Sequence, residues 1–184
     1  MGGEVALKGT DGIQMLKKAL ALGAQAEAEN KTSAALAQLR HLEEKPLVLT
    51  VSGSMGENVC ERLGLPYQII ASCSTATSPH DTVSAAQILK EHSVDLLLFA
   101  GGDGTARDVC TAIGCDLPTI GIPAGVKIQS AVFAVSPESA GRLALRFLRG
   151  ESHTLREAEV VDLDEDALCL IHHCLGVGAV VGKR

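Results

Sequence analysis

The sequence has few aromatic residues and no excess of positive charge. Phe, Tyr and Trp make up 2% of its 184 residues, Trp is absent, and the formal net charge is -6. Proteins that bind nucleic acids commonly use aromatic rings to stack on bases and basic patches to hold phosphates. The composition therefore argues against nucleic-acid binding. Hydrophobic residues still make up 46% of the chain, so small aliphatic side chains must fill the core of one domain, or of one domain and a fragment.

We expect no signal peptide, and the sequence also lacks a long hydrophobic run and the dense cysteine spacing of a secreted scaffold. The apolar tail at residues 167–181 is shorter than the roughly 20 residues of a membrane-spanning helix and contains His172 and His173. Its Cys-x-x-His-His-Cys run has zinc-ligand residue types but poor spacing, and an interface or tail segment is the simpler interpretation. We expect a cytoplasmic protein without membrane contact, in which all six cysteines are reduced: Cys60, Cys73, Cys110, Cys115, Cys169 and Cys174.

Helical and strand-like segments alternate along the chain. Helical apolar spacing covers residues 13–22 and 26–42, and cap signals predict helices from Ser54, Ser78 and Ser136, with a further helix over 105–113. Compact apolar runs predict strands at 47–51, 67–71, 95–100, 118–122 and 159–163. This alternation predicts a doubly wound α/β fold, with a mostly parallel sheet, helices on both faces and ligands at the carboxyl ends of the strands.

The central motif is the loop Gly-Gly-Asp-Gly-Thr at residues 101–105, which follows a strongly apolar strand. It is neither a Walker A loop nor a G-x-G-x-x-G fingerprint. Its glycines let the backbone approach a ligand closely, as phosphate-binding loops require. Asp103 would repel phosphate unless it binds a metal ion, accepts a proton from an attacking hydroxyl or holds a sugar hydroxyl, and these roles indicate phosphoryl transfer. The alternative is a turn aspartate that caps the next helix.

Several other residues are candidates for nucleotide contacts. Arg107 lies one turn into the predicted helix and could reach a phosphate or pair with a surface acid. Lys127 follows a strand end rich in small residues, where a lysine can neutralise phosphate. Polar groups near two further loops complete the set, with helix capping as their alternative role: Lys8, Thr10 and Asp11, and Ser52 and Ser54.

Three separated motifs resemble the ATP-NAD kinase family, in its acetoin-catabolism X-protein branch. They are LKGTDG at residues 7–12, GGDGTARDV at 101–109 and GIPAGVKIQSAVFAVSPESAG at 121–141. The wider superfamily includes diacylglycerol kinases and 6-phosphofructokinases. The resemblance covers residues 1–166 and implies a nucleotide-binding domain whose first strand is missing. Residues 167–184 stand where the family continues with a β-rich acceptor domain.

By this resemblance, the chain transfers the γ-phosphoryl group of ATP, bound with Mg²⁺, to a ribose hydroxyl of NAD. Asp103 would lie at the reacting hydroxyl, and a wall of loop residues would face the phosphates: Gly101, Gly102, Gly104 and Thr105. The truncated pattern predicts little or no turnover. Two alternatives are a non-catalytic nucleotide-binding or assembly module and a kinase that acts on a lipid or sugar. An uncovered sheet edge and the apolar tail also predict a homo-oligomer, most simply a dimer.

Overall fold

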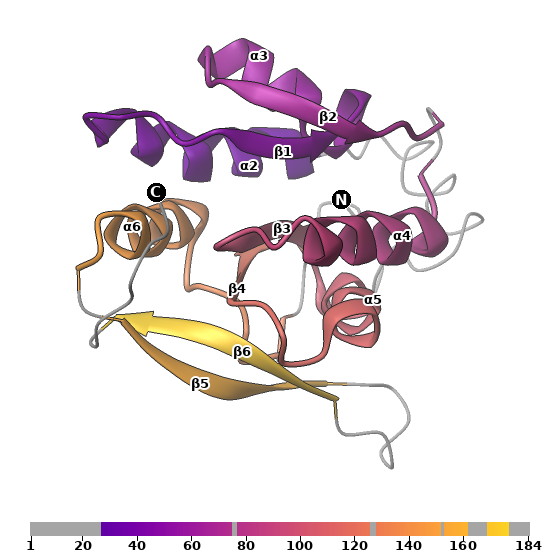
Figure 1. Cartoon of the computed structure of the whole chain (residues 1–184). Coiled ribbons are helices and arrows are strands. Elements are labelled where there is room, and N and C mark those ends of the chain that lie inside the picture. Colours follow the sequence, from indigo (N-terminus) through magenta and orange to yellow (C-terminus); the bar gives the residue numbers. More distant parts are fainter. Residues whose placement is uncertain (1–26, 75–76, 126–127, 152, 162–168, 177–184) are drawn as a thin grey trace.

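The structure is a computed structural model, and it describes residues 27–74, 77–125, 128–151, 153–161 and 169–176 (Figure 1). Lys8, Thr10, Asp11 and Lys127 therefore lie outside the described residues, as does the helix predicted over 13–22. Strands and helices alternate along most of the described chain, and three of the four strand pairs among the described residues are parallel. The predicted α/β class is confirmed.

The described strands form two sheets. In the first, β1 (Val48–Val51) pairs in parallel with β2 (Tyr67–Ala71). In the second, the order is β3-β4-β6-β5, in which β3 (Leu97–Gly101) and β4 (Thr119–Pro123) are parallel. Among the described residues, no strand joins β1 to β3, where a doubly wound sheet would be continuous.

The second sheet is mixed rather than uniformly parallel. β6 (Cys169–Gly176) pairs in parallel with β4 through Thr119 and His173, and antiparallel with β5 (His153–Val160) along its whole length. The predicted strand at 159–163 is thus misplaced, because it overlaps only the last two residues of β5. The segment expected to be an apolar tail contributes an inner strand.

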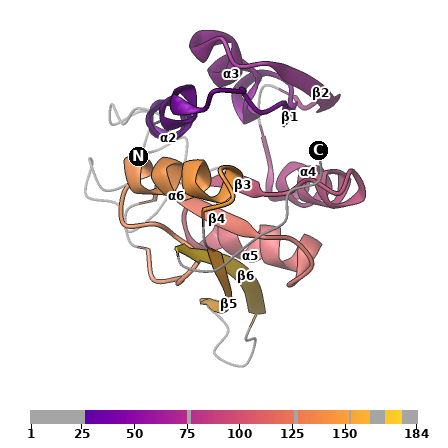
Figure 2. The same ribbon diagram turned by 60° about the vertical axis from the view of Figure 1, so that its left-hand side comes forward.

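Helices cover both faces of the β3–β4 pair (Figure 2). On one face, the buried Ile120 and Ile122 of β4 belong to a cluster with α2 (Ala28–Leu36) and α6 (Pro137–Leu148). On the other, Leu97 and Phe99 of β3 cluster with α4 (Pro79–Glu91) and α5 (Asp103–Ile113). The close approach of α2 and α6 requires Gly141, since a Cβ there would overlap the carbonyl oxygen of Ala35.

The helix boundaries follow local capping chemistry. Ser78 and Asp81 form a capping box at α4, and the Ser136 hydroxyl accepts the Ser139 N–H at the start of α6. The predicted cap at Ser54 is wrong, because Gly56 precedes α3 (Glu57–Leu63) and a short 3₁₀ turn, η3 (Gly53–Met55), stands before it. The Glu57 carboxylate instead accepts the Gly53 N–H, at 2.6 Å. A second 3₁₀ turn, η2 (Ala37–His41), extends α2, so the predicted helix over 26–42 is divided.

The cysteines only partly match the expectation of reduced thiols. Cys60, Cys73 and Cys115 carry thiols, whereas Cys110, buried on α5, is disulfide-bonded. Spacing along the chain could not indicate this bond, because pairing depends on which cysteines the fold brings together. Among the described residues, no helix is long and apolar enough to cross a membrane.

Candidate nucleotide site

The predicted phosphate loop lies where β3 passes into α5. β3 ends at Gly101, Gly102 is the N-cap residue, and Asp103 begins the helix. The turn is tight enough that a Cβ on Gly101 would overlap the Thr105 side chain. The first N–H groups of α5, which have no acceptor within the helix, therefore lie at the carboxyl end of a buried strand, which is an arrangement suited to an anion.

A second loop, which follows β4, is fastened to the first at two points. At one point, the N–H groups of Ala124 and Gly125 both donate to the Gly101 carbonyl, each at 2.9 Å. The backbones also touch, because a Cβ built on Gly125 would lie 2.9 Å from the Gly102 Cα. Since that neighbour is backbone and cannot rotate away, position 125 requires glycine while the loops keep this contact.

The Asp103 carboxylate makes the other attachment. The Gln129 N–H donates to it, with N···O distances of 3.0 and 3.2 Å to its two oxygens, and the Ser130 N–H donates to Oδ1 at 2.9 Å. None of the roles predicted for Asp103 included this contact. The negative charge of Asp103 holds the second loop in place through backbone donors.

Lys127 belongs to this second loop, between its two attachments. Gly125 is bound to Gly101 on one side, and Gln129 is bound to Asp103 on the other. Lys127 itself lies outside the described residues.

Gly104 and Arg107 lie on α5, beyond the helix start. The Arg107 guanidinium approaches the Asp108 carboxylate at 3.7 Å and is 39% exposed, while the Asp108 side chain is 17% exposed. Burial raises the pKa of the Asp108 carboxyl above its usual range, and the positive charge of Arg107 opposes that rise. Arg107 therefore already neutralises part of an internal charge.

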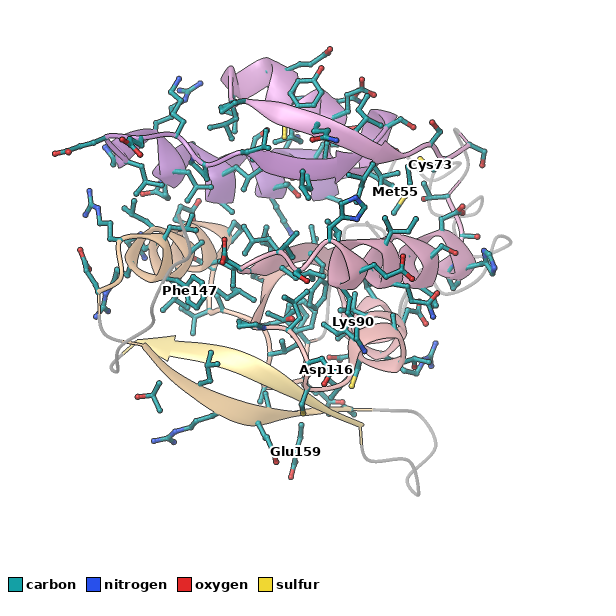
Figure 3. The ribbon with its side chains drawn as sticks, in the orientation of Figure 1. Met55, Cys73, Lys90, Asp116, Phe147 and Glu159 are labelled. Atoms are coloured by element: carbon teal, nitrogen blue, oxygen red, sulfur yellow. The ribbon has the colours of Figure 1, made fainter. Side chains whose placement is uncertain are left out.

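Ser52 and Ser54 do not belong to the sheet that carries the loop at residues 101–105. They follow β1, which belongs to the other sheet. The Ser52 hydroxyl accepts the Cys73 N–H at 3.0 Å and so links the ends of β1 and β2. Figure 3 places Cys73 and Met55 near this same end of the two-stranded sheet. Ser52 has a structural role here, and Ser54 is exposed.

The described residues contain no group of three or more side chains suited to hold a metal ion. This is compatible with magnesium chemistry, because Mg²⁺ usually binds through substrate phosphates, waters and only one or two carboxylates.

The sequence matches the family model for the ATP-NAD kinase N-terminal domain over residues 21–152. The chain belongs to this family. The match contains both loops that meet at Asp103, whereas the LKGTDG motif lies before its first residue. Neither a curated protein nor a solved structure matches the chain.

Sequence reasoning did not identify the partners of Asp103. Gln129 and Ser130 lie within the third motif, but their contribution is made by backbone N–H groups, which every residue except proline carries. The only sequence signal was the pair of small residues Ala124 and Gly125, which we interpreted as room for a ligand to approach closely. The structure shows that the other loop does so.

Proposed function

We propose that the chain binds Mg²⁺·ATP and is a kinase of the NAD kinase type, which transfers the γ-phosphoryl group to a ribose hydroxyl of NAD. The observation that carries the proposal is the junction of the two loops at Asp103. It joins a helix N-terminus, a glycine-lined backbone and a carboxylate at the ends of two parallel strands. Membership of the ATP-NAD kinase family supports the nucleotide and the reaction class.

In this proposal the N–H groups at the start of α5 bind phosphate oxygens, with the Thr105 hydroxyl beside them. Lys127 neutralises the transferred group as a point charge, and Arg107 is a second candidate cation. Asp103 lies at the acceptor hydroxyl. A carboxylate offers about four lone-pair positions, so its oxygens retain room for a hydroxyl beside the two backbone donors. We assign Lys8, Thr10 and Asp11 to the rim of the same site.

The second candidate function is a nucleotide-binding module without catalysis. One observation favours it: Asp103 already has a structural task, since it holds the second loop through three N–H···O contacts. A carboxylate that holds a loop in place is needed for the fold whether or not the protein transfers a phosphoryl group. Binding of Mg²⁺·ATP is common to both functions, and turnover separates them.

Two measurements on the full chain test the proposal. Calorimetric titrations with ATP, NAD and NADP, each with Mg²⁺, test binding, and NADP formation from Mg²⁺·ATP and NAD tests chemistry against Asp103→Asn as the blank. NADP formation that the substitution abolishes supports the kinase. Nucleotide binding without NADP formation supports the module. Heat signals absent for all three nucleotides would refute both.

We also propose that the protein is a cytoplasmic homodimer. Leu47 and Ile69, on or beside the two strands of the β1–β2 sheet, are 60% and 42% exposed, and exposed apolar side chains of this size favour burial against a partner. Light scattering at micromolar concentration should give twice the chain mass. A monomeric mass would contradict the dimer.

A further inference from the structure

Ser130 stands between the candidate site and the end of β5. Its side chain and backbone are 4% exposed, which makes it one of the few fully buried polar residues among those described. Its own N–H donates to the Asp103 carboxylate at 2.9 Å, and its hydroxyl oxygen accepts the Val161 N–H at 3.0 Å. One residue thus makes two hydrogen bonds in opposite directions.

A neighbouring bond fixes the same junction. The N–H of Ala131 donates to the Glu159 carbonyl at 3.0 Å, so two consecutive residues of the loop are bound to the last residues of β5 and the position after it. These bonds hold the Ser130 side chain and the peptide group that follows Ser130, and so limit how far Ser130 can turn. The direction in which the Ser130 N–H points, and therefore the place it gives the Asp103 carboxylate, depends on this anchorage.

We infer that Ser130 is a positioning residue, whose hydroxyl fixes the second loop to β5 so that its N–H holds Asp103 in the orientation that phosphoryl transfer needs. Loss of the hydroxyl removes the acceptor of the Val161 N–H in a part-buried bond and loosens one of the two anchors of Ser130. Catalytic groups need placement within fractions of an ångström. A small rotation at Ser130 should therefore reduce catalysis more than it reduces the stability of the fold. The inference rests on the proposed function, since the orientation of Asp103 affects a reaction only if Asp103 belongs to a catalytic site.

The test compares Ser130→Ala with a matched control, Thr119→Val. The Thr119 hydroxyl is fully buried and donates to the Leu117 carbonyl at 2.9 Å, at the opposite end of β4. Both substitutions remove one buried hydroxyl that is bonded to the backbone, so both should reduce global stability by similar amounts. Only the substitution at position 130 touches the support of Asp103.

The first measurement is amide hydrogen exchange by NMR in the ligand-free chain. The Gln129 N–H belongs to an exposed residue and is protected by its bond to Asp103. We expect Ser130→Ala to accelerate its exchange roughly fivefold or more, the factor that corresponds to one lost hydrogen bond. Thr119→Val should leave this amide unchanged. Equal exchange in the two variants would overturn the inference.

A second variant, Val161→Pro, removes the donor of the same bond and leaves Ser130 intact. It should accelerate hydrogen exchange of the Gln129 amide as Ser130→Ala does. If Ser130→Ala does not fold, this variant alone tests the link between Ser130 and Asp103. Unchanged exchange in Val161→Pro would count against the link.

The second measurement is Mg²⁺·ATP affinity, which Ser130→Ala should lower and Thr119→Val should not. If the unaltered chain does not bind Mg²⁺·ATP, the proposed function fails. The exchange result then still supports or overturns the Ser130 link, so the two failures are distinguishable.

Discussion

Asp103→Asn tests the two-loop junction with almost no change of shape. Asparagine retains one oxygen, which can accept the Ser130 N–H, but it places an NH₂ group where the other oxygen accepted the Gln129 N–H. A hydrogen bond to a charged acceptor contributes about 1.5–3 kcal/mol, against roughly 1 kcal/mol for a neutral one. A negative charge at a helix N-terminus adds about 0.3–1 kcal/mol.

These contributions give an expected loss of about 2 kcal/mol in the free energy of unfolding. We take the low end of their summed range because Gln129 is exposed. For a chain of this length that loss lowers the Tm by about 4–8 °C. Denaturant unfolding measures it, with Asp95→Asn as control, because Asp95 is an exposed aspartate just before β3. The control should change stability by less than about 0.5 kcal/mol.

The reasoning is refuted if Asp103→Asn and Asp95→Asn unfold alike. A helix cap alone would give that result, since asparagine caps helices as well as aspartate does. The same variant also tests the site, because any thermal shift by Mg²⁺·ATP or by NAD in the unaltered chain should be absent from Asp103→Asn. Equal shifts would count against the placement of Asp103 at the nucleotide.

Three further predictions address other parts of the molecule. Lys127→Ala should weaken ATP binding with a loss that shrinks as salt is added, because ions screen a point charge, and equal ATP affinity at low salt would contradict its role. Gly141→Ala should cost about 1–3 kcal/mol in unfolding free energy, because the new methyl overlaps the Ala35 carbonyl, and a stable variant would show that α2 and α6 adapt. Burial raises the pKa of the Asp108 carboxyl, so the folded state binds this proton more tightly than the unfolded state does. Lowering the pH from that raised pKa toward the ordinary carboxyl pKa should therefore increase the free energy of unfolding relative to that of Asp108→Asn. The same pH dependence of denaturant unfolding in both proteins would refute this.

Local signals predicted most of the helices and the parallel strands. Ser78-Pro79 and Ser136-Pro137 marked two helix starts correctly, because a cap residue and an N1 proline act within one turn. The apolar run before Gly101 predicted β3 and the helix that follows the loop. In each case the residues that decide the structure lie next to one another in the sequence.

The errors arose where distant residues decide. β6 was interpreted as a tail because its partners, β4 and β5, are set by the fold and not by its own pattern. The contacts of Asp103 were missed because Gln129 and Ser130 act through their backbone, so their side chains carry no signal. Of the candidate site, the loop around Asp103 was predictable, whereas its attachment to the second loop required the structure.

The place of β6 has a consequence for the order in which this protein acquires its structure. The last described strand lies inside its sheet, and it must reach back past α6 to pair Thr119 with His173. Such a pairing closes a long loop of chain before any contact compensates the lost entropy, and it is slow for that reason. During synthesis, Gly121 of β4 can bond to residues 132–134, but the edge at Thr119 leaves the ribosome open and stays exposed to wrong partners until residues 169–176 follow.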